Sequence, residues 1–97
     1  MSLTRHTTVS RTTDVLSTDV DDELVVIHLD SNAYYGFDSI GRRIWELIEQ
    51  PRSIIDVCAA LCEEFDVAPE ECESDVLAFL EELASSSVVH AHDTAIQ

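Results

Sequence analysis

The chain has 97 residues, 45% of them hydrophobic, and its 20 Asp and Glu residues against five Arg and no Lys give a formal net charge of −15. This length fits one small domain and leaves no room for a separate catalytic domain. Neither nucleic acid nor a membrane is expected as a partner, because no Lys or Arg follows Arg52 and no apolar run approaches the roughly 20 residues of a spanning helix.

The N-terminal residues contain no apolar stretch typical of a secretory signal, so a cytoplasmic protein is expected. The acidic balance suits cationic peptide or protein partners, or it serves only solubility, and charge alone does not separate these two interpretations. Three cysteines without an export signal argue against a disulfide framework.

The first half of the chain is predicted to form an arm and three strands. Residues 1–12 are Thr-rich and are predicted to be a flexible arm. Residues 14–20 favour a first strand, and residues 24–29 favour a second because they are short, apolar and rich in β-branched side chains. A turn over residues 30–32 leads into a third strand over residues 33–37. Short turns between consecutive strands predict an antiparallel meander with the third strand at its edge.

Three helices are predicted to follow. Asp38 caps the first and Pro51 ends it, Ser53 with Asp56 begins the second, and Pro69 begins the third. The buried stripes expected at helical spacing are Ile40, Ile44, Leu47 and Ile48 beside Trp45, then Ile54, Cys58, Leu61 and Phe65, and finally Cys72, Val76, Phe79, Leu80 and Leu83.

The order of elements predicts an α+β fold, in which a three-stranded antiparallel sheet is followed by three helices as in a winged helix-turn-helix. A short last strand is expected over residues 88–90. The predicted domain spans residues 13–90, between the arm over residues 1–12 and a frayed tail over residues 91–97.

No residue pattern indicates catalysis or metal binding. Cys58 lies on an apolar helical stripe, where cysteine is commonly a buried and inert side chain. The spacing of Cys58 and Cys62 relative to His90 and His92 matches no zinc module. Paired carboxylates are predicted to lie on solvated helix faces, and the two glycines do not form a phosphate loop. We therefore expect no catalytic residue, no metal and no cofactor.

The aromatic third strand is the remaining candidate site. Side chains alternate along a strand, so Tyr35 and Phe37 are expected to face the core and Tyr34 to face outward. Taken alone, the tyrosines are explained by ordinary packing and surface cover. The strand contains no Pro or Lys, and such an open edge can accept an extended peptide by β-augmentation.

The residues D-S-N-A-Y-Y-G-F-D-S-I-G-R-R-I-W, from Asp30 to Trp45, resemble the signature of the PqqD-like family, also called the RiPP recognition element. The matching residues are Tyr34, Tyr35, Phe37, Asp38, Gly41, Ile44 and Trp45. The third helix, P-E-E-C-E-S-D-V-L-A-F-L-E-E-L, is similar to the C-terminal helix of that family. The chain departs from the family at Ala33, which is often glycine, and after the third helix, where serines replace a common glycine.

The resemblance implies a domain that binds the leader peptide of a ribosomally made precursor as an added strand, in a groove closed by the third helix. The peptide-binding residues that it implies are Asn32, Ala33, Tyr34, Tyr35 and Phe37 on the strand side and Asp75, Val76, Phe79 and Glu82 on the helix side. It thus implies a non-catalytic adaptor.

A free-standing acidic domain of this length most resembles the recognition subunit of lasso-peptide biosynthesis, which works with a leader peptidase and an ATP-dependent macrocyclase. The alternative is a PqqD-type peptide chaperone serving a radical SAM enzyme. A winged-helix transcriptional regulator is disfavoured, because residues 69–84 contain no Lys or Arg to read DNA.

Overall fold

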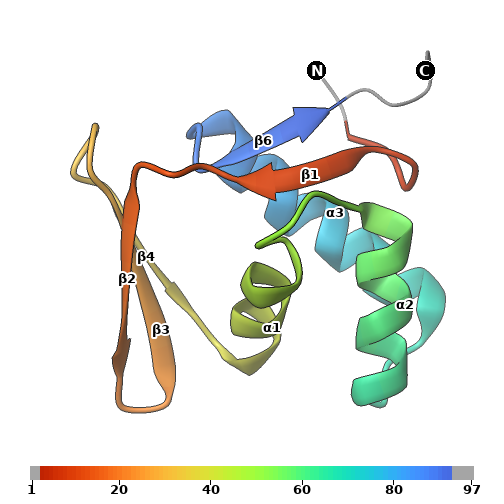
Figure 1. The fold of residues 1–97 in the computed structure, drawn as a ribbon. Helices are drawn as coiled ribbons and strands as arrows, with labels where there is room; N and C mark the ends of the chain where they lie inside the picture. The colour runs from red at the N-terminus through yellow and green to blue at the C-terminus, as the bar shows by residue number, and fades with distance from the viewer. Residues whose placement is uncertain (1–2, 93–97) are drawn as a thin grey trace.

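The computed structural model describes residues 3–92, which form six strands and three helices (Figure 1). In chain order the elements are β1 (Thr8–Arg11), β2 (Val15–Val20), β3 (Glu23–His28), β4 (Tyr34–Phe37), α1 (Ser39–Leu47), β5 (Arg52–Ser53), α2 (Ile54–Glu64), α3 (Pro69–Ser85) and β6 (Val89–His92). The strands form two three-stranded sheets, with the orders β2-β3-β4 and β5-β1-β6. No helix within residues 3–92 has the length and apolar character needed to cross a membrane.

The β2-β3-β4 sheet is the antiparallel meander that the sequence predicts. Its two turns contain Asp21 (φ 57°) and Asn32 (φ 60°), residue types that tolerate the left-handed region. The buried residues of β3 alternate along the strand: Leu24, Val26 and His28. One face of the meander therefore packs on the core and the other faces solvent.

The β5-β1-β6 sheet corrects the prediction at both ends of the chain. Residues 8–11, predicted as part of a flexible arm, form β1, which pairs with β5 and β6 and fully buries Val9. A lone valine among Thr, Ser and Arg gives no local signal for a strand whose main partner lies at the other end of the sequence. Residues 91 and 92 belong to β6 instead of a frayed tail, while the rest of the predicted tail lies outside the described residues.

The helices begin where the sequence predicts. Asp38 caps α1, because its carboxylate accepts a hydrogen bond of 2.9 Å from the N–H of Gly41. Ser53 caps α2 by accepting from the N–H of Asp56 at 3.3 Å. Pro69 is the first residue of α3, where its missing N–H is not needed.

A serine takes the place of glycine after α3. Ser87 adopts the left-handed region with φ 64°, and the N–H of Val88 donates to the carbonyl of Leu83 at 3.0 Å. This is the geometry in which helices commonly end on glycine, and a non-glycine residue adopts it at a cost of roughly 1–2 kcal/mol. The turn into β6 therefore forms without glycine.

The core is centred on Trp45, which is 2% exposed and lies between the two sheets. Phe37 of β4 packs against its ring at a centroid distance of 5.7 Å, and the guanidinium of Arg11 of β1 lies 5.0 Å from the ring centroid. One residue of the predicted α1 stripe is not in this core, because Ile40 is 38% exposed. Ile40 lies in the first turn of α1, where its side chain lines a groove.

Candidate functional site

A largely apolar groove of about 440 Å³ opens between the end of β4, the start of α1, the end of α2 and α3. It is lined by Glu23, Gly36 and Phe37 of the meander, Asp38, Ile40, Gly41 and Ile44 around the start of α1, Leu61, Phe65 and Val67 around the end of α2, and Cys72, Asp75, Val76 and Phe79 of α3. Its charged lining residues are all acidic. This lining suits an apolar side chain that has a basic neighbour.

The strand beside the groove, β4, has an open edge. It pairs with β3 on one side, and no strand within residues 3–92 pairs with its other side. The N–H of His28 donates to the carbonyl of Ala33 at 2.7 Å, which makes residues 28 and 33 a hydrogen-bonded pair. Such pairs alternate along antiparallel strands. In the observed register, Tyr35 therefore directs its N–H and C=O toward β3, whereas Tyr34 and Gly36 direct theirs to the open edge.

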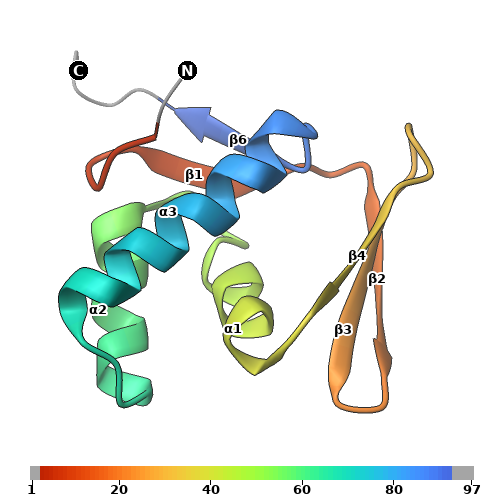
Figure 2. The same ribbon diagram turned by 180° about the vertical axis from the view of Figure 1, so that it is seen from behind.

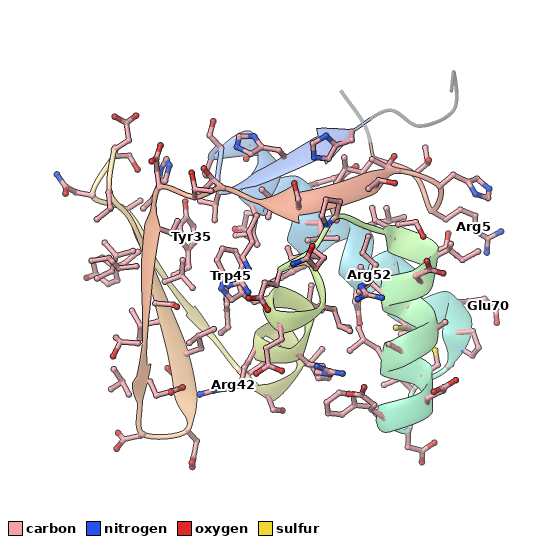
Figure 3. The ribbon with its side chains drawn as sticks, viewed as in Figure 1. Arg5, Tyr35, Arg42, Trp45, Arg52 and Glu70 are labelled. Carbon is pink, nitrogen blue, oxygen red and sulfur yellow. The ribbon has the colours of Figure 1, made fainter. Side chains whose placement is uncertain are left out.

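The side chains of β4 divide between the two faces of the sheet. Tyr34 is 75% exposed on the outer face, while Phe37 is buried and Tyr35 points toward Trp45 (Figure 3). The Phe37 ring also meets the Phe79 ring of α3 edge-on, at a centroid distance of 5.2 Å. Phe37 thus links the open edge strand to both α1 and α3, and it sets the separation of the groove walls.

The start of α1 approaches Phe37 closely because residue 41 is glycine. A Cβ atom at Gly41 would lie 3.1 Å from the Cβ of Phe37, tighter than an ordinary van der Waals contact. The cap formed by Asp38 holds the first turn of α1 in this position. The match of Phe37, Asp38 and Gly41 to the family signature therefore has a structural reason, which is to hold one wall of the groove.

The nine predicted peptide-binding residues fall into two groups. Four of them line the groove: Phe37, Asp75, Val76 and Phe79. Five do not line it: Asn32, Ala33, Tyr34, Tyr35 and Glu82. The strand residues of the second group lie in or next to the open edge of β4, and Glu82 is exposed on the turn of α3 that follows Phe79. The groove and the edge are neighbouring parts of one surface, because Gly36 and Phe37 belong to both.

The parts of the groove that come from α1 and α2 were not predicted from the sequence. Ile40 was assigned to the core, because helical spacing alone does not distinguish a core residue from the floor of a groove. Phe65 and Val67 flank Asp66 in the link between α2 and α3, and both are half-buried. Links in solvent are usually polar, so two large apolar residues in this short link are the sequence signal that it lines a groove.

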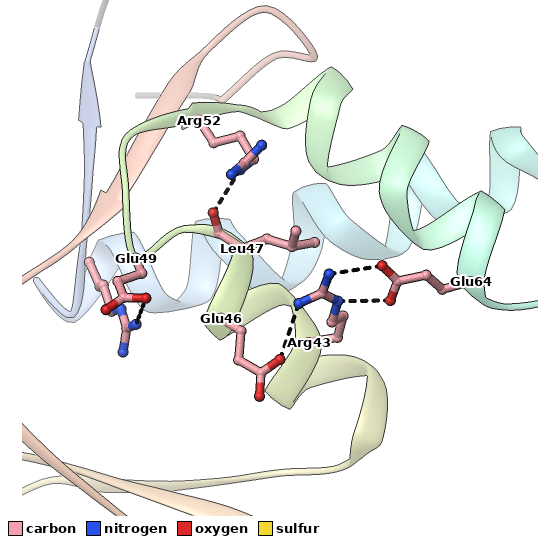
Figure 4. Close-up of polar contacts among 7 residues, drawn as sticks. Arg43, Glu46, Leu47, Glu49, Arg52 and Glu64 are labelled. Atoms are coloured by element: carbon pink, nitrogen blue, oxygen red, sulfur yellow. Dashed lines mark hydrogen bonds and ion pairs between the residues drawn. The ribbon is translucent and has the colours of Figure 1, made fainter.

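The arginines contact carboxylates or a carbonyl of the chain itself. Arg43 of α1 donates to Glu64 of α2 at 2.7 and 2.9 Å and to Glu46 at 3.2 Å (Figure 4). The hydrogen bonds from Arg43 lower the pKa of the Glu64 carboxyl below its ordinary value. The remaining contacts are Arg5 with Glu73, Arg11 with Glu49, Arg42 with Asp19, and Arg52 with the carbonyl of Leu47. Each arginine is therefore paired within the chain, and the many carboxylates without an arginine partner make the surface strongly acidic.

Two of the three cysteines, Cys58 and Cys72, are poorly suited to nucleophilic chemistry. Cys58 and Cys72 are buried, Cys62 is half-buried, and all three are free thiols. Burial raises the pKa of the Cys58 thiol, and burial with the nearby Cys58 raises the pKa of Cys72 to about 12. Both thiols are protonated at neutral pH, and the thiolate is the reactive form. Within residues 3–92 no three His, Cys, Asp or Glu side chains are grouped so as to hold a metal ion.

Comparisons with known proteins give one matching family model and two similar solved structures. A sequence model of the family described as coenzyme PQQ synthesis protein D (PqqD) matches residues 23–89. Among solved structures, the chain is similar to TbiB1 in complex with the TbiA(β) leader peptide, with 32% identity over 87% of this chain and 98% of that chain and a TM-score of 0.77. The fold is also similar to that of lasso peptide synthetase B1 complexed with the leader peptide, with 18% identity, coverage of 84% and 96%, and a TM-score of 0.74. The comparison with curated proteins finds no match.

The matched span runs from the first residue of β3 to the first residue of β6, and it includes every residue that lines the groove. The match covers more than half of the chain, and the resemblance of the strand-helix signature points to the same family. The chain therefore belongs to the PqqD family.

Proposed function

We propose that this chain is a non-catalytic adaptor that binds the leader peptide of a ribosomally synthesised precursor by strand addition. The observation that carries the proposal is the open edge of β4 beside the apolar groove. Strand addition needs unpaired backbone groups for affinity and pockets for alternate side chains for specificity. Tyr34 and Gly36 offer the backbone groups, and the groove between Ile40 and Phe79 offers the pocket.

The contact set that we propose contains the nine residues predicted from the sequence, together with Gly36 and Ile40. An apolar or aromatic leader side chain enters the groove, where Val76 and Phe79 meet it. A basic leader residue is received by Asp75 and Glu82, which are exposed on α3. Filled pockets contribute most of the affinity, whereas exposed charges mainly change the association rate and its salt dependence.

We infer that the pathway is lasso-peptide biosynthesis, in which the adaptor presents the bound precursor to a leader peptidase and an ATP-dependent macrocyclase in the cytoplasm. The likeness to TbiB1, solved with a leader peptide, supports the binding of a leader, and the shared fold of lasso peptide synthetase B1, also solved with its leader peptide, favours this pathway. The description of the matching family favours the second candidate, a peptide chaperone for a radical SAM enzyme. The burial and raised pKa values of Cys58 and Cys72 argue against catalysis by these two thiols in either role.

Titration of the chain with leader peptides from precursors encoded near its gene tests the proposal. We expect saturable binding by calorimetry, with the largest amide NMR shifts in β4 and around Val76 and Phe79 of α3. A scrambled leader of the same composition serves as the control. Shifts confined to the β5-β1-β6 sheet, or equal binding of the scrambled leader, would contradict the proposed site. The precursor class that binds most tightly separates the two pathways.

A further inference from the structure

Two consecutive arginines of α1 form ion pairs with the elements on either side of that helix. Arg42 pairs with Asp19 of β2. Arg43 donates from Nε and Nη2 to the two carboxylate oxygens of Glu64, at 2.7 and 2.9 Å, and Glu64 is the last residue of α2 (Figure 4). In both views of the fold α1 lies between the meander and α2 (Figures 1 and 2). The two arginines therefore link α1 to both of its neighbours.

The first ion pair acts on the strand wall of the groove. The register places Asp19 opposite Leu24 of β3, and Leu24 opposite Phe37 of β4, so the three side chains share one face of the meander. Leu24 and Phe37 are buried, so this is the face that packs on the core, and Phe37 lines the groove. Arg42 extends from α1 toward the meander (Figure 3). The pair therefore holds the groove end of β4 against α1.

The second ion pair acts on the part of the groove that comes from α2. Phe65 and Val67 follow Glu64 directly in the link to α3, and both line the groove, as does Leu61 one turn earlier in α2. Arg43 binds Glu64 through two parallel hydrogen bonds, a geometry that is both stronger and more directional than a single contact. The pair therefore fixes the end of α2 relative to α1.

The paired residues act on the groove without touching what it holds. Gly41 and Ile44, which precede and follow the two arginines in α1, line the groove, whereas the four paired side chains do not belong to the lining that residues 3–92 form. Exposed ion pairs contribute little to overall stability, and the apolar core holds the same elements together. A ligand that fills the groove is more sensitive, because a gap of a fraction of an ångström at one wall already removes much of the dispersion attraction there.

We propose that Arg42 and Arg43 are positioning residues for leader binding, and that their pairs with Asp19 and Glu64 set the separation of the groove walls on either side of α1. The inference rests on the proposed function, which supplies the ligand. Loss of either pair lets one wall move, and the leader side chain in the groove then loses contacts with that wall. Charge alone predicts the opposite, since removing an arginine makes the chain more acidic and attracts a basic leader more strongly.

Calorimetric titration with the leader peptide that binds wild type most tightly tests the inference. We expect Arg42→Ala and Arg43→Ala each to weaken leader binding by about threefold to fivefold, and the double variant by about tenfold or more, because the two pairs share no partner. Arg5→Ala is the matched control, since it removes an exposed ion pair with Glu73 that lies outside the groove lining. It should change leader binding by less than about 1.5-fold and lower the melting temperature about as little as the other two variants do.

Two further variants separate positioning from the loss of a charge. The exchange of Asp19→Arg with Arg42→Asp restores an ion pair at unchanged net charge, and it should recover most of the affinity lost in Arg42→Ala. Arg43→Lys keeps the charge but loses the fork that binds both carboxylate oxygens, so it should still bind leader more weakly than wild type. Alanine variants that bind leader as tightly as wild type, an exchange that recovers nothing, or an equal loss in Arg5→Ala would each contradict the inference and leave the adaptor role standing.

A measurement without leader keeps this inference distinguishable from the proposed function. Residual dipolar couplings of the leader-free chain report the orientation of the meander relative to α1. This orientation should differ between Arg42→Ala and wild type, and it should agree between Arg5→Ala and wild type. If wild type binds no leader but Arg42→Ala reorients the meander, positioning by the arginine is supported and the proposed function fails. The same orientation in Arg42→Ala and wild type would overturn the inference.

Discussion

The two sheets of this chain differ in how they are built and in what they leave free. The β5-β1-β6 sheet joins segments from the two ends and the middle of the sequence, and it buries Val9 and Val89 completely or nearly so. The β2-β3-β4 sheet is made of two local hairpins, and most of β2 is exposed. The non-local sheet closes the core, whereas the local meander presents an open edge and an open face. Both sheets contribute to the core, but the proposed leader-binding edge belongs to the meander alone.

The largest effect is expected at the residue where the two sheets meet. Trp45 contacts Arg11 of β1 and Phe37 of β4, and its replacement by alanine should lower the free energy of unfolding by about 3–5 kcal/mol. Tyr34→Ala, on the exposed face, should change it by no more than about 0.5 kcal/mol. Denaturant unfolding followed by circular dichroism measures both. A cooperative Trp45→Ala transition close to that of wild type would show that the ring does not join the sheets.

Proline at two neighbouring positions of β4 should separate folding from binding. Tyr35 donates its N–H to β3, so Tyr35→Pro removes a sheet hydrogen bond and should destabilise the fold by about 3 kcal/mol. Tyr34 directs its N–H to the open edge, so Tyr34→Pro should cost less stability and weaken leader binding. Thermal melts and leader titrations of both variants give the comparison. The reverse order of stabilities would mean that the hydrogen-bonding alternation is assigned to the wrong residues.

The walls of the groove should matter more for leader binding than the exposed charges beside it. Phe79→Ala should weaken binding by about 2 kcal/mol, and Glu82→Ala by less than about 0.5 kcal/mol at moderate salt. Phe79 also packs on Phe37, so Phe79→Ala changes the packing of the core as well as the groove. Ile40→Ala is therefore the second probe, because the Ile40 side chain is 38% exposed. This variant should weaken leader binding without lowering the melting temperature. Calorimetry is the measurement. A larger loss for Glu82→Ala than for either apolar variant would contradict a groove that binds through its apolar walls.

The smallest expected effects concern the thiols of α2 and α3. Native Cys58 and Cys72 should react with a thiol reagent more slowly than Cys62 at neutral pH, because burial keeps them protonated. Their pKa values are raised in the folded chain, so the folded state retains protons that the unfolded state releases above about 9. The free energy of unfolding should therefore fall as the pH rises from 9 toward 12. Rapid labelling of Cys72 in the native state would contradict this placement.

The same contrast explains what the sequence predicts well. The meander, the caps at Asp38 and Ser53 and the proline at the start of α3 depend on residues close together in sequence, and the predictions for them are confirmed. The β5-β1-β6 sheet could not be predicted, because β5 has two residues and β1 finds its partner near the other end of the chain. The role of Ile40 was missed for a related reason. Its spacing matches a buried stripe, and only the packing of α2 and α3 leaves it beside an open groove.

The central claim is that a leader peptide adds to the open edge of β4, and backbone methylation of the leader tests it most directly. In an added strand, alternate leader amides face Tyr34 and Gly36, and the amides between them face away. We predict that methylating the amides that face β4 weakens binding by about 100-fold or more, while methylating those between them leaves most of the affinity. If leaders methylated in the two patterns bind with the same affinity as the native leader, the strand-addition account is contradicted.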